Sequence, residues 1–288
     1  MRAYRFIEGN REEFGLRWLL GRTGILPNAY YNWQRQARKG YRQRKEDILG
    51  KISAIYHETG GILGHRSMRI FLKRDGISLS KTTVHKYMNR ELRLLSICRR
   101  KKPGYRKGRP HKVFPNLLGQ DFAVQGKNRV WCTDFTYLYL TTGEIRYNCT
   151  VLDLYDRSVV GSETGRWIST ELAIKAMDKA LHAQGEVPQG LILHSDQGSQ
   201  FTSRKFTEYC LEHGITQSMS KSGCPYDNAP MERYYNSLKE ELVNRYYFRT
   251  DDELRNAVAE YAFGWYNLVR PHSHNGYLTP HEKRFGTS

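Results

Sequence analysis

Three acidic residues stand where acids are costly or where ligands gather. Asp134 lies inside the apolar run "RVWCTDFTYLYL", where a carboxylate is unfavourable unless it is paired or binds a cation. Asp196 ends the short apolar run "LILHSD", and ligand sites in α/β proteins collect at the carboxyl ends of strands. Glu232 lies in the first turn of a helix expected to begin after Asn228. Taken singly, the aspartates could cap turns, and Glu232 could favour the helix dipole.

Taken together, the three acids predict a site for a hard cation. Carboxylate oxygens are the ligands that Mg²⁺ or Mn²⁺ prefers, and the chain has no Cys-x-x-Cys pair that would indicate zinc. Two such ions, about 3.5–4 Å apart, can activate a water or hydroxyl and stabilise the leaving oxygen in phosphoryl transfer. The five cysteines are interpreted as reduced packing residues: Cys98, Cys132, Cys149, Cys210 and Cys224.

The charge of the chain favours a polyanionic partner. Its 288 residues include 46 Lys and Arg against 29 Asp and Glu, a net charge of +17. Nucleic acid is the commonest such partner, although a basic protein can also use its charge for solubility or bind an anionic membrane. No run approaches the roughly 18 apolar residues of a membrane span, and the first residues lack the apolar core of a signal peptide. We therefore expect a cytoplasmic protein that has no membrane partner.

The pattern of elements from residue 126 onward predicts an α/β domain that positions the acids. Aromatic and β-branched runs separated by turn residues indicate a three-strand meander, after which helices and short strands alternate. The expected order is βββαβαβα, a mixed sheet flanked by helices. The strands are expected over 129–140, 143–155, 157–164, 190–196 and 215–220, and the helices over 170–185, 203–214 and from 229.

Two helical regions are expected before the sheet. Residues 1–40 contain two short helices joined by a Gly-containing turn, which fits a helix-turn-helix or an ordinary helical hairpin equally well. Residues 41–96 contain three helices: one with Ile48, Ile52 and Ile55 in line, a second closed by Gly76, and a third with Ser80 as N-cap.

The third of these helices has one apolar and one basic face. Val84, Tyr87 and Met88 are expected to face inward, while Lys81 and Lys86 face outward. A basic outer face suits a recognition helix in a DNA groove, although many three-helix bundles have one without touching DNA.

A basic linker is predicted over residues 97–125. The run "CRRKKPGYRKGRPHK" holds eight Lys or Arg and no acid, and its Gly and Pro residues prevent a regular element. It could be a solvated run or resemble a nuclear-localisation signal, but its place between two folded regions favours contact with DNA phosphates. The DNA-binding residues expected here are Arg99, Arg100, Lys101, Lys102, Arg106 and Lys107.

The order of these elements and several short sequence motifs resemble a known family. The motifs "WCTDFTY", "VLDLYDRSVVG", "HSDQGSQFTS", "SMSKSGCPYDNAPMERYYNSLKEEL" and "WYNLVRPHSHNGYLTP" are similar to bacterial insertion-sequence transposases of the OrfB type. These belong with retroviral integrases to the DDE superfamily, whose catalytic core is ribonuclease H-like. Thirty-five residues separate Asp196 from Glu232, the spacing typical of the D,D-35-E group. The resemblance covers residues 40–285.

This resemblance implies a function and roles for the acids. Asp134, Asp196 and Glu232 would bind two Mg²⁺ or Mn²⁺ ions in a catalytic core over residues 126–288. The chain would bind the terminal inverted repeats of an insertion sequence, cleave DNA, and join the freed 3′-hydroxyl to target DNA. A homo-oligomer is expected because two DNA ends must be held together. An upstream OrfA-type DNA-binding protein is a further possible partner or fusion.

The last predicted helix has an apolar stripe that is expected to pack on the sheet, formed by Met231, Tyr235, Leu238 and Leu242.

Other residues of this helix receive roles beside Glu232. Lys239 lies seven residues further on, hence on the same face, and matches a basic residue that would contact DNA near the scissile phosphate. It could equally be a surface lysine paired with a neighbouring glutamate. Asn228 is expected to cap the helix, and His194 to be a core or supporting histidine. Glu232 is expected within metal-bridging distance of both aspartates, unless the helix is displaced in the DNA-free state.

Some segments of the sequence depart from the family pattern. Two alternative functions also stay open. "GILGHRSM" stands where relatives show a Tyr-Gly-Tyr-Arg-like stretch, and "VGSET" where Gly-Trp is common. The His-His-Cys-Cys module of retroviral integrases has no counterpart in the sequence. A structure-selective nuclease of the same fold would cut without joining. A regulator derived from a transposase would bind DNA without cutting it.

Overall fold

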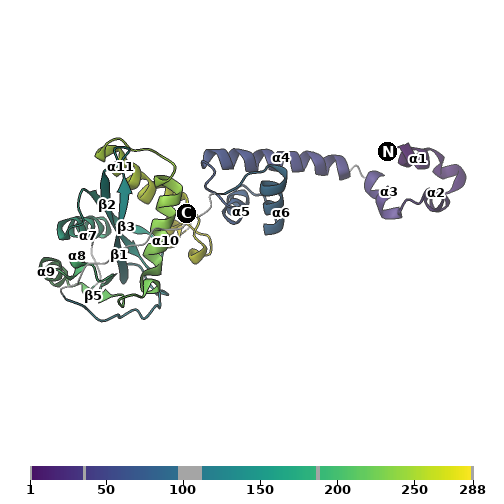
Figure 1. The fold of residues 1–288 in the computed structure, drawn as a ribbon. Helices are drawn as coiled ribbons and strands as arrows, with labels where there is room; N and C mark the ends of the chain where they lie inside the picture. The colour runs from purple at the N-terminus through teal and green to yellow at the C-terminus, as the bar shows by residue number, and fades with distance from the viewer. Residues whose placement is uncertain (1, 35–36, 97–111, 186–188, 287–288) are drawn as a thin grey trace. The chain divides into compact units, whose positions relative to one another are not determined.

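The catalytic acids predicted from the sequence lie in the larger of two units of the chain. The fold is known from a computed structural model that describes residues 2–34, 37–96, 112–185 and 189–286. Contacts divide the chain into Met1–Ser96 and Ile97–Ser288. Figure 1 shows the helices of the first unit and the helix-flanked sheet of the second.

The first unit begins with three short helices around a small core. They are α1 (Arg2–Phe14), α2 (Leu16–Thr23) and α3 (Pro27–Gln34). Ile7, Leu19, Leu20 and Tyr30 are buried between them. Gly24 ends α2 at a φ of 66°, a left-handed conformation that glycine adopts without steric cost. The helix α1 was not predicted, since the apolar pattern of its residues is weak.

The rest of the first unit agrees with the predicted three-helix region. It contains α4 (Ala37–Glu58), α5 (His65–Arg74), and α6 (Lys81–His85) with its π-helical continuation η1 (Lys86–Glu91). The N-cap prediction is confirmed, because the hydroxyl of Ser80 accepts a hydrogen bond from the amide of Thr83 at 3.1 Å. The predicted apolar positions are buried: Ile48, Ile52, Ile55, Val84, Tyr87 and Met88.

The second unit is built on a five-stranded mixed sheet with the order β3-β2-β1-β4-β5. Its strands are β1 (Val130–Tyr139), β2 (Ile145–Asp153), β3 (Val159–Gly165), β4 (Ile192–Ser195) and β5 (Thr216–Met219). The first three form the predicted antiparallel meander, and β4 and β5 run parallel to β1. The prediction of a ribonuclease H-like core with a mixed sheet is confirmed.

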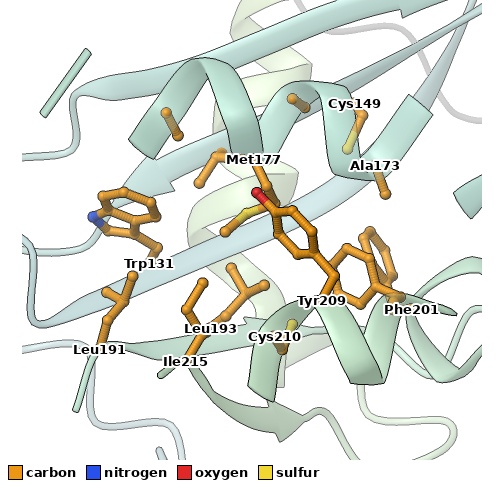
Figure 2. Close-up of a cluster of buried hydrophobic side chains, with 14 of the residues drawn as sticks. Trp131, Cys149, Ala173, Met177, Leu191, Leu193, Phe201, Tyr209, Cys210 and Ile215 are labelled. Atoms are coloured by element: carbon orange, nitrogen blue, oxygen red, sulfur yellow. The ribbon is translucent and has the colours of Figure 1, made fainter. Parts of the chain in front are cut away.

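One face of the sheet is covered by α7 (Thr170–Gln184), α8 (Ser199–Thr202) and α9 (Arg204–Glu212). The largest core cluster lies between these helices and the sheet, with Trp131, Leu193 and Met177 among its members (Figure 2). Helix α7 approaches β3 so closely that a Cβ at Gly161 would meet the carbonyl oxygen of Ala176 at 2.3 Å. Glycine is therefore required there.

The opposite face is covered by the helix that carries Glu232. A single 3₁₀ turn, η2 (Pro225–Asn228), leads into α10 (Ala229–Leu238), which continues as η3 (Lys239–Val243). The predicted apolar stripe is confirmed, because Met231, Tyr235 and Leu238 are buried in the second core cluster. The C-terminal elements that were not predicted complete this layer: α11 (Asp251–Ala259), η4 (Glu260–Val269), η5 (Ser273–Asn275) and α12 (Pro280–Phe285).

The cysteines in the described residues are packing residues, as expected. Cys132, Cys149 and Cys210 are buried with free thiols, and Cys224 is partly exposed. Burial raises the pKa of the Cys149 and Cys210 thiols to about 12, so both stay protonated at neutral pH. Cys98 lies outside the described residues. No helix within the described ranges is both long enough and apolar enough to cross a membrane.

Two fully buried acids fasten the C-terminal helix α12 to the sheet. Nη1 of Arg284 lies 2.9 Å from Asp153 Oδ2 and 2.6 Å from Asp156 Oδ2, and both carboxylates are inaccessible to solvent. Burial raises the pKa of Asp153, and the nearby Asp156 raises it further, so the guanidinium is needed to keep this charge in the interior. These two aspartates are structural.

We expect Arg284→Ala to lower the free energy of unfolding by about 3–5 kcal/mol, because it leaves two buried carboxylates without their cation. Urea unfolding of the full chain measures the change. Arg204→Ala is the matched control, since Arg204 is 91% exposed and its ion pair with Glu208 is worth at most about 1 kcal/mol. Equal stability of the two variants would contradict this account.

Candidate active site

The register of β1 and β4 brings the two predicted aspartates to the same level of the sheet. The strands are parallel, and Cys132 pairs with His194. Asp134 lies two residues after Cys132 in β1, and Asp196 lies two residues after His194, directly after the last residue of β4. Side chains two residues apart in a strand point to the same face. Cys132 packs in the cluster beneath α10, so Asp134 belongs to the face that this helix covers.

Helix α10 is tied to the sheet at the backbone of Asp134. The hydroxyl of Tyr235 donates a hydrogen bond to the Asp134 carbonyl and accepts one from the amide of Thr150 at 3.1 Å. Thr150 is the cross-strand partner of Asp134. Burial raises the pKa of Tyr235 well above its usual value, which keeps the hydroxyl protonated as a donor. Glu232 lies one turn before Tyr235 on the same helix.

The three acids do not form one closed group of ligands in this structure. Within the described ranges, no three His, Cys, Asp or Glu side chains lie close enough together to hold a metal ion. The expected approach of Glu232 to both aspartates is therefore not seen here, and the assignment of the three acids as metal ligands stays a prediction. Local backbone donors orient the two aspartates instead. The amide of Phe135 donates to Asp134 Oδ1 at 2.7 Å, and that of Gly198 donates to Asp196 Oδ1 at 2.9 Å.

Asn228 is the N-cap residue of α10, as predicted, but its side chain does not cap the helix. Its side chain makes no capping hydrogen bond, because the 3₁₀ turn η2 runs directly into the helix. The amide nitrogen Nδ2 instead donates to the carbonyl of Thr133 on β1 at 3.4 Å. Asn228 thus joins the start of α10 to the residue before Asp134. Its buried Oδ1 has no hydrogen-bond partner among the described residues.

A buried carboxylate, Asp227, holds the loop that leads into α10. It accepts hydrogen bonds from Asn116 Nδ2 at 2.9 Å, Gln120 Nε2 at 2.7 Å and the amide of Lys221 at 2.8 Å. The bond from Lys221 and those from Gln120 and Asn116 hold the pKa of Asp227 below its ordinary value. The described part of the predicted linker, from residue 112 onward, thereby packs on the second unit.

His194 supports the same loop from β4. It is fully buried and shares hydrogen bonds with the hydroxyls of Ser218 at 2.9 Å and Ser220 at 3.1 Å. Burial lowers its pKa, so the imidazole is neutral at pH 7. The expectation of a core histidine is confirmed.

A second buried acid, Glu241, fixes the far end of the Glu232 helix. It accepts hydrogen bonds from the hydroxyl of Tyr261 at 2.9 Å, from Trp265 Nε1 at 3.2 Å and from Arg270 Nε at 3.0 Å. These donors join η3 to η4 and to the segment after it. The sequence reasoning missed Glu241, although its place three residues after Leu238, on the apolar side of the helix, was an available signal.

The predicted DNA-binding residues are spread over both units. Lys239 begins η3, and its ammonium lies 4.0 Å from the centre of the Tyr137 ring on β1. In the first unit, Lys81 and Lys86 are exposed on the outer face of α6 and η1. The six linker residues from Arg99 to Lys107 lie outside the described residues.

Family comparisons agree with this architecture. Two models described as "Integrase core domain" match residues 124–225 and 213–280, and an "HTH-like domain" model matches residues 43–102. Together they define an integrase catalytic core preceded by a helix-turn-helix-like DNA-binding domain.

Several transposases of bacterial insertion sequences are similar to nearly the whole chain. The transposase for insertion sequence element IS904 of Lactococcus lactis is 35% identical over 84% of this chain and 96% of its own length. Transposase InsF for IS3A of Escherichia coli is 30% identical over 97% of both chains. A 31 kDa protein of insertion element IS600 from Shigella sonnei is 33% identical over 89% of this chain and 94% of its own length. The chain belongs to this family of insertion-sequence transposases, enzymes of the DDE type.

Solved structures of retroviral integrases are more distant. The catalytic core of HTLV-2 integrase, solved in complex with magnesium, is 18% identical, with a TM-score of 0.42, covering 56% of this chain and 98% of that one. The integrase in an intasome of simian T-cell lymphotropic virus is 16% identical, with a TM-score of 0.47, covering 76% and 71%.

We expect Asp227→Asn to lower the free energy of unfolding by about 1–3 kcal/mol at pH 7, because an amide cannot accept all three hydrogen bonds. Because folding lowers the pKa of Asp227, its stabilisation is complete above the ordinary pKa of about 4 and is lost as the pH falls through the folded value. The difference between variant and parent should therefore shrink in acid.

Urea unfolding at several pH values, with hydrogen exchange at the Lys221 amide, measures both effects. Glu208→Gln serves as control, because Glu208 is half-exposed on the outer surface of α9. An unchanged unfolding midpoint together with unchanged protection of the Lys221 amide would show that Asp227 does not hold the loop.

Proposed function

We propose that Asp134, Asp196 and Glu232 form the catalytic centre of this transposase and hold two Mg²⁺ or Mn²⁺ ions. The observation that carries the proposal is the level position of Asp134 in β1 and of Asp196 directly after the parallel strand β4, with Asp134 on the sheet face that the Glu232 helix covers. The donor set fits a hard cation, because all three side chains offer carboxylate oxygens. When bound, such ions supply Lewis acidity and lower the pKa of a coordinated water or hydroxyl.

The side chains around the acids keep them in place for this chemistry. Tyr235 holds the Glu232 helix at the backbone of Asp134, and Asn228 holds its first turn at Thr133. Asp227 and Glu241 fasten the two ends of the same helix assembly to neighbouring segments. These contacts hold the backbone around the three acids in place.

The proposed reaction has two transfer steps at phosphorus. In the first, water attacks a phosphodiester at the end of the element, the bond to the 3′-oxygen breaks, and a 3′-hydroxyl is released. In the second, that hydroxyl attacks a target phosphodiester, so one phosphorus–oxygen bond forms as another breaks. The nucleophiles are water and DNA, so no covalent bond between protein and DNA is required.

The remaining parts of the chain would bring DNA to this centre. We assign residues 1–40 and 41–96 to binding of the terminal inverted repeats, with Lys81 and Lys86 on phosphates. The basic linker, 97–125, would follow the DNA backbone, and residues 126–288 would form the catalytic core. Lys239 would contact DNA near the scissile phosphate.

The active transposase would be an assembly of several protein chains on DNA. Two element ends must be held together for transposition, so we propose a homo-oligomer on DNA. A protein of the OrfA type, encoded upstream, is a further partner, either fused to this chain or as a separate protein. The DNA substrate associates the protein with the nucleoid.

We expect Asp134→Asn, Asp196→Asn and Glu232→Gln each to reduce DNA cleavage and strand joining by roughly 10³-fold or more, because each removes a charged ligand. DNA-end binding should persist. The measurement uses an end-labelled duplex with Mg²⁺, and a pre-cut duplex tests joining by itself. Glu171→Gln, an exposed acid on α7, is the matched control. Full activity in any of the three variants would refute the assignment.

We expect the double variant Lys81→Ala with Lys86→Ala to weaken DNA binding and to flatten its salt dependence. Each phosphate contact contributes about 0.9 to the slope of log affinity against log salt concentration, so the slope should fall by roughly 1.8. Fluorescence anisotropy with an element-end duplex measures it. Lys51→Ala is the control, because the Lys51 ammonium is paired with Asp75 at 3.0 Å. An unchanged slope would exclude both lysines from phosphate contact.

A further inference from the structure

Strand β1 continues past its neighbour β4 and has an open edge beside the proposed catalytic centre. The ladder between the two strands runs from Val130 to Cys132, whereas the ladder with β2 continues to Tyr139. In the described residues, β1 beyond Cys132 therefore pairs with β2 alone. This open stretch begins at the level of Asp134.

Aromatic side chains line one face of this stretch. Leu138 points to the α10 and α11 side, where it packs with Leu254 and Val258. Tyr137 and Tyr139, which alternate with Leu138, therefore lie on the opposite face, and their rings are 5.8 Å apart in an edge-on arrangement. Their cross-strand partners on β2, Tyr147 and Ile145, share that face. We call these four side chains the aromatic platform: Tyr137, Tyr139, Ile145 and Tyr147.

The helix that covers this face stops short of the aromatic platform. Leu172, in the first turn of α7, lies over Gly165, the β3 partner of Tyr147. The next pair of residues on this face, Tyr139 and Ile145, is open to solvent, since Tyr139 is 51% exposed and Ile145 is 41% exposed. Trp167, two residues after Gly165, is 76% exposed and adds a further aromatic side chain to this end of the sheet. Tyr139 and Ile145 are thus the uncovered part of a face that is otherwise core, and Tyr137 and Tyr147 are partly buried beside them.

A cation connects the aromatic platform with the helix of the proposed catalytic centre. The ammonium of Lys239 lies 4.0 Å from the centre of the Tyr137 ring, and Lys239 follows Glu232 by seven residues. A tyrosine surface with an adjoining ammonium has the composition of sites that bind single-stranded nucleic acid, where bases stack on rings and a cation faces the phosphates.

We propose that the aromatic platform binds unpaired nucleotides of the DNA strand that enters the catalytic centre, with a base stacked on Tyr139 and the Lys239 ammonium above Tyr137 facing a phosphate. Unpaired nucleotides fit because duplex bases hide their faces from protein side chains, whereas frayed or single-stranded bases expose them. A second copy of the chain is a poorer occupant. Four side chains offer far less than the roughly 800 Å² per partner that stable interfaces bury.

The position of the entering strand rests on the proposed function, but binding of unpaired nucleotides can be measured without catalysis. The full chain is titrated into a fluorescent single-stranded oligonucleotide in EDTA. Tyr139→Ala should weaken binding by about five- to 100-fold, the loss found when one stacking ring is removed. Tyr139→Trp should restore it, because the indole also stacks. Leu211→Ala, which removes an exposed apolar side chain on α9, is the control and should bind like the parent.

A stacking reporter and a mass measurement decide between occupants. 2-Aminopurine in the oligonucleotide should be quenched by the parent chain and by Tyr139→Trp, but not by Tyr139→Ala. Equal single-strand affinity and equal quenching in parent and Tyr139→Ala would overturn the proposal. So would a Tyr139→Ala variant that changes only the oligomeric mass in sedimentation, which would assign the surface to a second copy. The binding measurement contains EDTA and therefore no free metal ion. Its result does not depend on whether the three acids bind metal.

Discussion

The hydrogen bonds of the Tyr235 hydroxyl are the contact on which the proposed site depends. They join α10 to the backbone of Asp134 on β1 and of Thr150 on β2, and so fix the helix at the level of the first aspartate. The hydroxyl is buried, and its partners, which include the carbonyl of Asn148 at 3.3 Å, are backbone groups that the sheet holds in place. Breaking this contact would leave buried polar groups unpaired, which costs free energy beyond the loss of one hydrogen bond. The helix position is therefore well determined even before any ligand binds.

Acids in this chain fall into two groups that differ in their surroundings. Asp153, Asp156, Asp227 and Glu241 are buried, and each is satisfied by protein donors that connect separate segments. The three proposed catalytic acids are only partly buried: Asp134 and Asp196 lie just beyond the ladder between β1 and β4, and Glu232 lies on α10. A carboxylate fully engaged by protein donors has no oxygen left for a cation. The partial exposure of the second group is thus consistent with metal binding, whereas the first group has a scaffolding role.

Sequence reasoning succeeded where a strong local pattern coincided with a simple packing rule. The meander, the alternation of helices with short parallel strands and the apolar stripe with Met231 and Leu238 followed from periodicity. It failed for η4, whose residues Glu260–Val269 are apolar on several sides and show no clear helical face. It also failed for the side chain of Asn228, because a preceding 3₁₀ turn cannot be seen in a list of residue types. Asp227 and Glu241 were missed as anchors because their donors are distant in the chain.

The sequence by itself determined the class of chemistry, since three carboxylates at these spacings in a basic chain indicate metal-dependent phosphoryl transfer on DNA. It also determined the order of the elements from β1 to α10, because each apolar pattern there is local. Only the tertiary structure decided that Asp134 and Asp196 are level, since the register of two strands about 60 residues apart depends on core packing. The tertiary structure alone also left Tyr139 and Ile145 uncovered, because the point where α7 begins relative to β3 is set by their mutual packing. An alternating apolar pattern predicts a half-buried strand. It does not predict which helix covers the strand or where that helix ends.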